Sequence, residues 1–281
     1  MPTVDSSGVP RVVYRGTDNH IHELHLDESQ GNWWHADLSG IVTNVSAQDS
    51  AGNPFGFVDA NGILRVVYRG TDNDIHEIRW DGAWLEADLS AIVTNGAATM
   101  AAGDPFGFVD ANGISRVVYL GVDSHIHEIR WDGDWLEADL SASIINPSVS
   151  NPNIPWAPLV PPFAAGDPRA YVTPDGITRV LYRGADTDIH EIRWEPTLGS
   201  WIDADLTTPV AGVPGYVQAL GDPFAYVDWS GYDRVVYTAM DQQIHELYLV
   251  GIWQSANLSN PVGVAPGYVM PYYEPPPAAC Y

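Results

Sequence analysis

The sequence predicts an all-β protein folded as a five-bladed β-propeller, with four antiparallel strands in each blade. The main observation is a repeat: RVVYRGTDNHIHEL at 11–24 returns in similar form at 65, 116, 179 and 234. The arginines that open the copies are 54, 51, 63 and 55 residues apart, a period typical of propeller blades. The 281 residues also include 26 glycines and 22 prolines, because many short strands need many turns.

Each repeat is expected to contain four strands, and the third copy shows them most clearly. Its strands correspond to PFGFVDANG, SRVVYLG, HIHEIRW and DWLEADLS, with the turn formers A-N-G, V-D-S and D-G between them. No unit has the 3.6-residue periodicity of a helical solenoid. We expect one domain over 1–281, with blades at approximately 1–45, 46–96, 97–160, 161–213 and 214–281.

The two ends of the chain predict a closed ring. VDSSG at 4–8 matches FVDANG of later copies, but the GDPFG that precedes the motif in the third copy is absent. The C-terminal PGYVMPYYEPP matches PGYVQALGDP at 214–223, which leads into a first strand. The tail is therefore expected to complete the first blade, and the distance from Arg234 through the terminus to Arg11 is 58 residues, another ordinary period.

The composition limits the partners. The net charge of −24, from 36 acidic and 12 basic residues, disfavours nucleic acid and anionic membranes, and no stretch is apolar enough for membrane insertion. Cys280 is the single cysteine, so no intramolecular disulfide forms, although a homo-oligomer through Cys280 or the blade faces is an open alternative. The opening MPTVDSSGVPRVVYRG lacks the features of a cleavable secretion signal, which leaves the compartment undetermined.

An arginine and a glutamate, twelve residues apart, recur in every copy. If the turn between them is symmetric about Thr17, they lie opposite one another on the same side of the sheet and form a bidentate ion pair. Two interpretations stay open: the pair fixes the hairpin register, or it also presents donors and acceptors to a hydroxylated ligand. The pairs are Arg11–Glu23, Arg65–Glu77, Arg116–Glu128, Arg179–Glu191 and Arg234–Glu246.

Tryptophans follow the glutamates in two positions. Trp80, Trp131 and Trp194 lie near a hairpin end and are candidates for stacking on the apolar side of a sugar. The second position opens the last strand of each copy, mostly as W-x-x-A-D-L, and is expected to belong to the blade core. Its members are Trp33, Trp84, Trp135, Trp201 and Trp253.

A histidine and an aspartate also recur in every copy. With a two-residue period, the histidines point away from the adjacent glutamate, and we expect each to form a hydrogen bond between blades. They are too dispersed to share a metal ion, so no metal site or cofactor is predicted. The aspartates are expected to cap backbone N–H groups of the turn. The two series are His22, His76, His127, His190 and His245, and Asp18, Asp72, Asp123, Asp186 and Asp241.

The pattern R-V-x-Y…I-x-E-x-x-W-D-G-x-x-W resembles the repeat of the fucose-binding β-propeller lectins of fungi and bacteria. The resemblance covers all five units and implies a multivalent lectin for fucosylated glycans, with sites between adjacent blades. It implies that the Arg–Glu pairs hydrogen-bond the sugar while Trp80, Trp131 and Trp194 stack on it. Two departures are visible: those lectins have six blades, and Leu26 and Leu249 replace the stacking tryptophan, which weakens or empties two sites.

Catalysis is not expected. An active site needs one asymmetric group of residues in unlike environments, whereas these polar residues form five similar stations. The chain also lacks a G-x-S-x-G elbow and a phosphate-binding loop. The alternative to a lectin is a structural or assembly propeller in which the Arg–Glu pairs are architectural.

Overall fold

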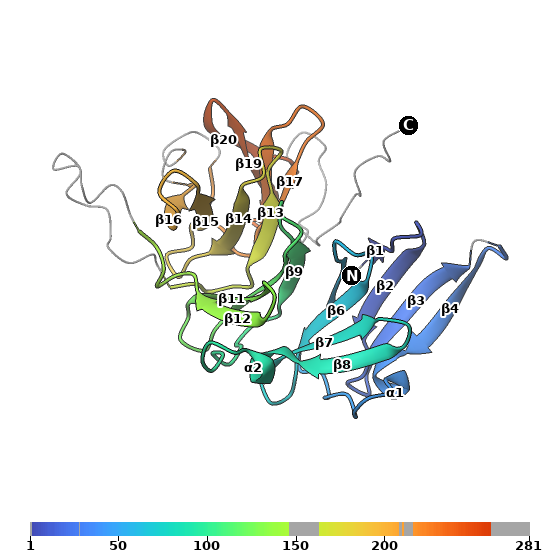
Figure 1. The fold of residues 1–281 in the computed structure, drawn as a ribbon. Coiled ribbons are helices and arrows are strands. Elements are labelled where there is room, and N and C mark those ends of the chain that lie inside the picture. The colour runs from blue at the N-terminus through green and yellow to red at the C-terminus, as the bar shows by residue number, and fades with distance from the viewer. Residues whose placement is uncertain (1, 28, 146–162, 208–209, 211–215, 260–281) are drawn as a thin grey trace.

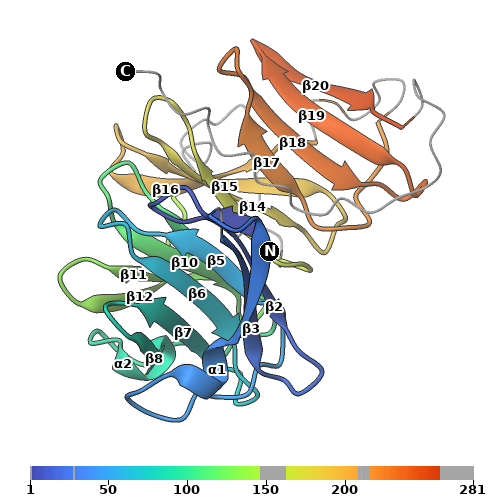
Figure 2. The ribbon, with the colours of Figure 1, turned by 90° about the vertical axis from the view of Figure 1, so that its right-hand side faces the viewer.

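The computed structural model describes residues 2–27, 29–145, 163–207, 210 and 216–259. Within them the chain forms five four-stranded antiparallel sheets, each built from strands consecutive in sequence, as the repeats predict. Figures 1 and 2 show the sheets following one another in chain order. Among the described residues, no helix is long and apolar enough to span a membrane.

The strands of each blade follow the order of the chain. The first blade contains β1 (Pro2–Val4), β2 (Pro10–Arg15), β3 (Ile21–Asp27) and β4 (Asn32–Asp37). The second contains β5 (Phe55–Val58), β6 (Leu64–Arg69), β7 (Ile75–Trp80) and β8 (Trp84–Asp88), and the third contains β9 (Phe106–Val109), β10 (Ser115–Leu120), β11 (Ile126–Trp131) and β12 (Trp135–Asp139). The fourth contains β13 (Arg169–Val172), β14 (Thr178–Arg183), β15 (Ile189–Glu195) and β16 (Ser200–Asp205). The fifth contains β17 (Phe224–Val227), β18 (Asp233–Thr238), β19 (Ile244–Val250) and β20 (Ile252–Asn257).

Single helical turns follow the outer strands of the first two blades, α1 (Leu38–Ile41) and α2 (Leu89–Ile92). Asp37 and Asp88 precede them and accept hydrogen bonds from the backbone N–H groups of Gly40 and Ala91. The aspartate of the W-x-x-A-D-L motif therefore ends a strand and caps the turn that follows it.

The repeated hairpin has a different register from the one expected. Tyr14 pairs with His22 and Val13 with Glu23, so the turn is centred on Asp18, not Thr17. Asn19 adopts a left-handed conformation with φ of 67°, and the Asp18 carboxylate accepts the backbone N–H of His20. These two features lengthen the turn, and they recur in all five blades. The capping role predicted for Asp18 is confirmed.

Each sheet has two chemically different faces. We call the side that carries the repeated arginine and glutamate the arginine face, and the side that carries the repeated tyrosine and histidine the tyrosine face. The arginine face of one blade packs on the tyrosine face of the next: Val118 and Ile126 of the third blade share a core cluster with Tyr182 and Ile192 of the fourth. Equivalent clusters join the first to the second, the second to the third and the fourth to the fifth blade.

Backbone hydrogen bonds also tie successive blades together. The segment leading into β5 bridges to Gly70 of its own blade, and Ser50 donates its N–H to the carbonyl of Asn19 in the preceding blade. The same bond recurs from Ala101 to Asn73, from Ala164 to Ser124 and from Ala219 to Thr187. The carbonyl of the left-handed turn residue in one blade thus accepts a hydrogen bond from the segment that leads into the first strand of the next blade.

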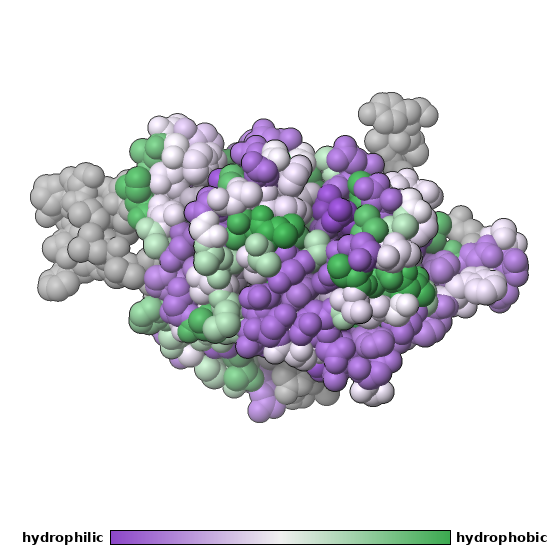
Figure 3. All heavy atoms as spheres, turned by 60° about the horizontal axis from the view of Figure 1, so that its bottom comes forward, coloured by the Kyte–Doolittle hydropathy of each residue, from purple (hydrophilic) through white to green (hydrophobic). Residues whose placement is uncertain are grey.

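Closure of the ring stays a prediction. The tyrosine face of the first blade is uncovered in the described part of the chain, since Tyr14 is 36% exposed whereas Tyr68 and Tyr119 are fully buried. The C-terminal tail that is expected to complete this blade lies outside the described residues. At the surface, Figure 3 shows mostly hydrophilic atoms with separate hydrophobic patches, in keeping with the acidic composition.

Candidate functional site

The arginine and glutamate of every blade form an ion pair on the arginine face. The distance from the arginine Nη1 to the nearest glutamate oxygen is 2.5 Å for Arg11–Glu23, 2.6 Å for Arg65–Glu77, 2.5 Å for Arg116–Glu128, 2.8 Å for Arg179–Glu191 and 2.9 Å for Arg234–Glu246. The expectation that the two lie directly opposite is wrong by two residues. Arg116 pairs with Arg130 and Val118 with Glu128, so the ion pair runs diagonally across the ladder.

The expected bidentate geometry is also wrong for most blades, because the guanidinium divides its donors between two carboxylates. Arg116 donates from Nη1 to Glu128 and from Nε to Asp110 at 2.8 Å. The other Asp110 oxygen accepts the N–H groups of Asn112 and Ile114, which holds the turn after β9. Asp5, Asp59 and Asp228 make the same contact with their arginines.

A second arginine approaches the glutamate in the second, third and fourth blades. Arg130 Nη1 donates to Glu128 Oε1 at 3.1 Å, and Arg79 and Arg193 make the equivalent bond in their own blades. The Glu128 side chain is only 1% exposed, and both its oxygens are occupied by arginines. The surface that this cluster offers is therefore mainly guanidinium.

The cluster keeps its arginine charged. Burial lowers the pKa of Arg116, but attraction to Glu128 and hydrogen bonds to Glu128 and Asp110 outweigh it, so the pKa is raised. The group is a permanent donor over the physiological pH range.

The sequence interpretation missed two members of this cluster. The aspartate lies six residues before the arginine in four copies, and the second arginine lies two residues after the glutamate in three. Both offsets were visible as repeats. Until the register is known, the aspartate looks like an ordinary turn residue and the second arginine looks like an ordinary polar residue of a strand.

The candidate stacking tryptophans lie on the tyrosine face and are partly exposed: Trp80 by 48%, Trp131 by 45% and Trp194 by 39%. Each makes an edge-on contact with the tryptophan that opens the next strand, at ring-centroid distances of 5.4, 5.5 and 5.6 Å. Trp135 and Trp201 are buried, as expected of core residues. Trp33 is exposed, contrary to expectation, because the described residues do not cover the tyrosine face of the first blade.

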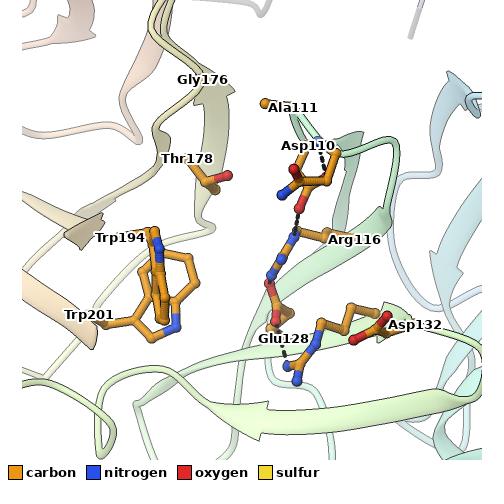
Figure 4. Close-up of a pocket in the computed structure, with 11 residues that line it drawn as sticks. Asp110, Ala111, Arg116, Glu128, Asp132, Gly176, Thr178, Trp194 and Trp201 are labelled. Atoms are coloured by element: carbon orange, nitrogen blue, oxygen red, sulfur yellow. Dashed lines mark hydrogen bonds and ion pairs between the residues drawn. The ribbon is translucent and has the colours of Figure 1, made fainter. Parts of the chain in front are cut away.

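A cavity of about 320 Å³ brings the two sets of residues together between the third and fourth blades. Arg116, Glu128 and Arg130 line it from the third blade, and Thr178, Trp194 and Trp201 from the fourth. Figure 4 shows the tryptophans on one side of this cavity and Arg116 with Glu128 on the other. Arg116 therefore shares the cavity with Trp194 of the following blade, whereas Trp131 of its own blade lies on the opposite face of its sheet.

The second and third blades show the same juxtaposition. The Arg65 guanidinium lies 5.9 Å from the ring centroid of Trp135, the counterpart of Trp201. The arginine face of the second blade thus meets Trp135 of the third.

The repeated histidines do not bridge blades, so that expectation is wrong. His76 Nε2 lies 3.2 Å from the Asp72 carboxylate and Nδ1 lies 2.8 Å from Glu86, both in the same sheet. His127 has the same arrangement with Asp123 and Glu137. The reason is register: the turn aspartate and the acid on the outer strand are the nearest partners on that face.

The described residues include one group with ligand atoms close enough for a metal ion: Asp123, His125 and Asp139, all within 4.8 Å of one another. The His125 ring nitrogen Nδ1 already forms a hydrogen bond of 2.8 Å with Asp139. This is an ordinary acid–histidine pair at an exposed hairpin end, and it lies outside the cavity.

No protein-family model matches the sequence, and a comparison with curated proteins found no match. Solved structures do match. The Aleuria aurantia lectin, described as six-bladed with a novel mode of fucose recognition, is 18% identical with a TM-score of 0.58, and the match covers 95% of this chain and 79% of the other. AofleA from Arthrobotrys oligospora is 17% identical over 89% and 69% of the two chains, with a TM-score of 0.56.

A third match is the SapL1 lectin in complex with α-methyl fucoside, 19% identical over 90% and 77% of the two chains, with a TM-score of 0.54. The chain has the fold of the β-propeller lectins. At these identities the likeness is one of fold, and it spans most of this chain. The blade number differs from that of the Aleuria aurantia lectin, which has six blades, whereas the described residues of this chain form five sheets.

Proposed function

We propose that the protein is a multivalent lectin that binds fucose or a similar sugar between adjacent blades. The observation that carries this proposal is the cavity between the third and fourth blades. It places two arginines opposite a partly exposed tryptophan. The solved structures that share the fold include lectins in complex with fucosides.

The lining suits the two sides of a sugar. The Trp194 ring offers an apolar surface to C–H groups, while Arg116 and Arg130 offer N–H donors to ring and hydroxyl oxygens. A volume of about 320 Å³ lies at the lower end of the range of small-molecule sites, which suits a monosaccharide unit.

The charges around the cavity favour a neutral sugar. Arg116 and Arg130 are balanced by Asp110, Glu128 and Asp132, which all line the cavity. The site therefore supplies charged donors without a net positive charge, and a sugar with a carboxylate or sulfate gains little from it.

An Arg–Glu pair followed by a stacking tryptophan in the next blade recurs at two other interfaces. Arg11 and Glu23 are expected to face Trp80, and Arg65 and Glu77 to face Trp131. Several sites on one molecule gain avidity on a surface that carries many glycans, so weak single sites suffice.

A structural role for the Arg–Glu pairs is the second candidate, and one observation favours it. Glu128 is almost completely buried and both its oxygens are bound within the protein, so it orients the arginines more readily than it contacts a sugar. In this view the pairs hold the sheets without any ligand.

Isothermal titration against a panel of monosaccharides that includes L-fucose tests the proposal, and a glycan array extends it to linkages. We expect saturable binding with more than one site per chain, strongest for fucose or a sugar of similar shape. A folded protein that binds nothing on the panel or the array contradicts the lectin function and leaves the structural role.

A further inference from the structure

We propose that Asp233 closes the interface between the fourth and fifth blades by occupying Arg179 in place of a sugar. This inference rests on the proposed lectin function and determines the number of sites.

The interface between the third and fourth blades is the reference. There the Arg116 Nε donates to Asp110 and Nη1 donates to Glu128. Among the described residues, Nη2 has no protein partner. Because Arg116 lines the cavity, this nitrogen is available to a ligand oxygen.

Arg179, the counterpart of Arg116 in the fourth blade, is held differently. Thr173 replaces the turn aspartate and accepts the N–H of Ile177, so Arg179 Nε is buried without a partner. The Nη1 atom instead contacts both oxygens of Glu191, at 2.8 and 3.0 Å. The Nη2 atom lies 3.6 Å from Asp233 Oδ2, which forms an ion pair across the blade boundary.

Asp233 is the first residue of β18 and occupies the position that Thr178 holds in the wall of the cavity. The counterparts in the other copies are Pro10, Leu64 and Ser115, so only the fifth blade has an ionisable group there. The Asp233 side chain is 8% exposed, which places its carboxylate inside the interface.

Displacing Asp233 from Arg179 is costly. A buried carboxylate that loses its cation keeps the desolvation penalty without the attraction that offset it. Burial raises the pKa of Asp233, the Arg179 charge lowers it, and the net shift is upward, as expected for a carboxylate in a poorly solvated place. A neutral sugar cannot replace that charge.

The apolar side of the interface is altered as well. Leu249 pairs with Trp253 where Trp194 pairs with Trp201 in the fourth blade. This interface therefore offers little to a sugar. It lacks the stacking tryptophan, and the Nη2 atom of Arg179 is paired with Asp233.

Reciprocal variants test the inference. The Asp233→Thr/Leu249→Trp variant restores the residues of the fourth blade at this interface, and the Thr178→Asp variant introduces the carboxylate beside Arg116. The number of bound L-fucose molecules per chain, from isothermal titration, is the readout. We expect one additional site in the first variant and one fewer in the second, with Val122→Ala, an exposed turn substitution, as an unchanged control.

Circular dichroism and the melting temperature establish that each variant is folded, and either variant alone is decisive. If the wild type binds L-fucose and a folded variant has the same number of sites as the wild type, the inference is wrong while the lectin function stands. Absence of binding in the wild type and in both variants overturns the lectin function and this inference together.

Discussion

Two repeated polar systems in this molecule differ in their surroundings. The histidine–carboxylate system on the tyrosine face is enclosed within one sheet, with His127 bonded to Asp123 and Glu137 of its own blade. The arginine–glutamate system on the arginine face ends at a cavity whose opposite wall belongs to the next blade. Both are repeated five times, so repetition does not distinguish a site from a scaffold. The difference is whether the polar group faces another blade across a cavity.

Three substitutions test this difference and a fourth tests a carboxylate outside both systems, in decreasing order of the expected change in the free energy of unfolding.

Glu128→Gln is expected to have the largest effect. It removes the charge that Arg116 and Arg130 share, and loss of one partner from a buried ion pair costs about 3 kcal/mol. Chemical denaturation measures this loss, and isothermal titration measures the accompanying loss of one sugar site. An unchanged stability with lost binding would show that Glu128 serves the ligand alone.

His127→Ala is expected to cost about 2 kcal/mol, because Glu137 loses a buried hydrogen-bond partner and the ring leaves a void. Fucose affinity is expected to stay the same, since His127 is buried within its sheet and does not line the cavity. A variant that keeps its melting temperature but loses sugar binding would reverse the roles assigned to the two systems.

Asp167→Asn tests a carboxylate outside both systems. Burial, followed by repulsion from Asp104, raises the pKa of Asp167 to about 6 from an ordinary value of 3.8. The folded protein therefore binds the extra proton between about pH 4 and 6, and its stability falls as the pH rises through this range. The variant is expected to gain about 1 kcal/mol at pH 7.5 and little at pH 4. Equal melting-temperature shifts at both pH values would contradict this.

Trp194→Ala is expected to change stability least, by less than about 1 kcal/mol, because the ring is 39% exposed. One sugar site is expected to be lost, as judged by isothermal titration beside Val122→Ala. If the variant keeps all its sugar sites, stacking on Trp194 is not part of the mode of binding.

The fold was predictable because it depends on local signals. Turn formers and alternating apolar residues marked the strands, and the five copies fixed the number of sheets. The hairpin register was not predictable. It depends on the left-handed backbone conformation of Asn19, and the residue types at this position in the five copies do not reveal that conformation. An error of two residues preserved the face of Arg11 and Glu23, so the ion pair was predicted despite the wrong register.

The site was predictable only in part. The sequence shows which residues repeat, but the partners of a side chain across two sheets depend on how the blades pack. The resemblance to the lectins placed the sites between adjacent blades, but the structure was needed to see that an arginine shares its cavity with the tryptophan of the following blade. The same limit explains the histidines, whose carboxylate partners lie on the same sheet, and Asp233, whose role appears only beside Arg179.

The two unlike faces of each blade have a consequence for how such a protein evolves. In the proposed lectin, the second, third and fourth repeats each carry half of one binding site, the Arg–Glu pair, on the arginine face and half of another, the exposed tryptophan, on the tyrosine face. If the proposal holds, duplication of one of these three repeats creates a complete new site without any further mutation, and deletion of one rejoins the two halves that remain. If Asp233 closes its interface as proposed, a single residue at this position removes one site, so the number of sites is open to change by single mutations.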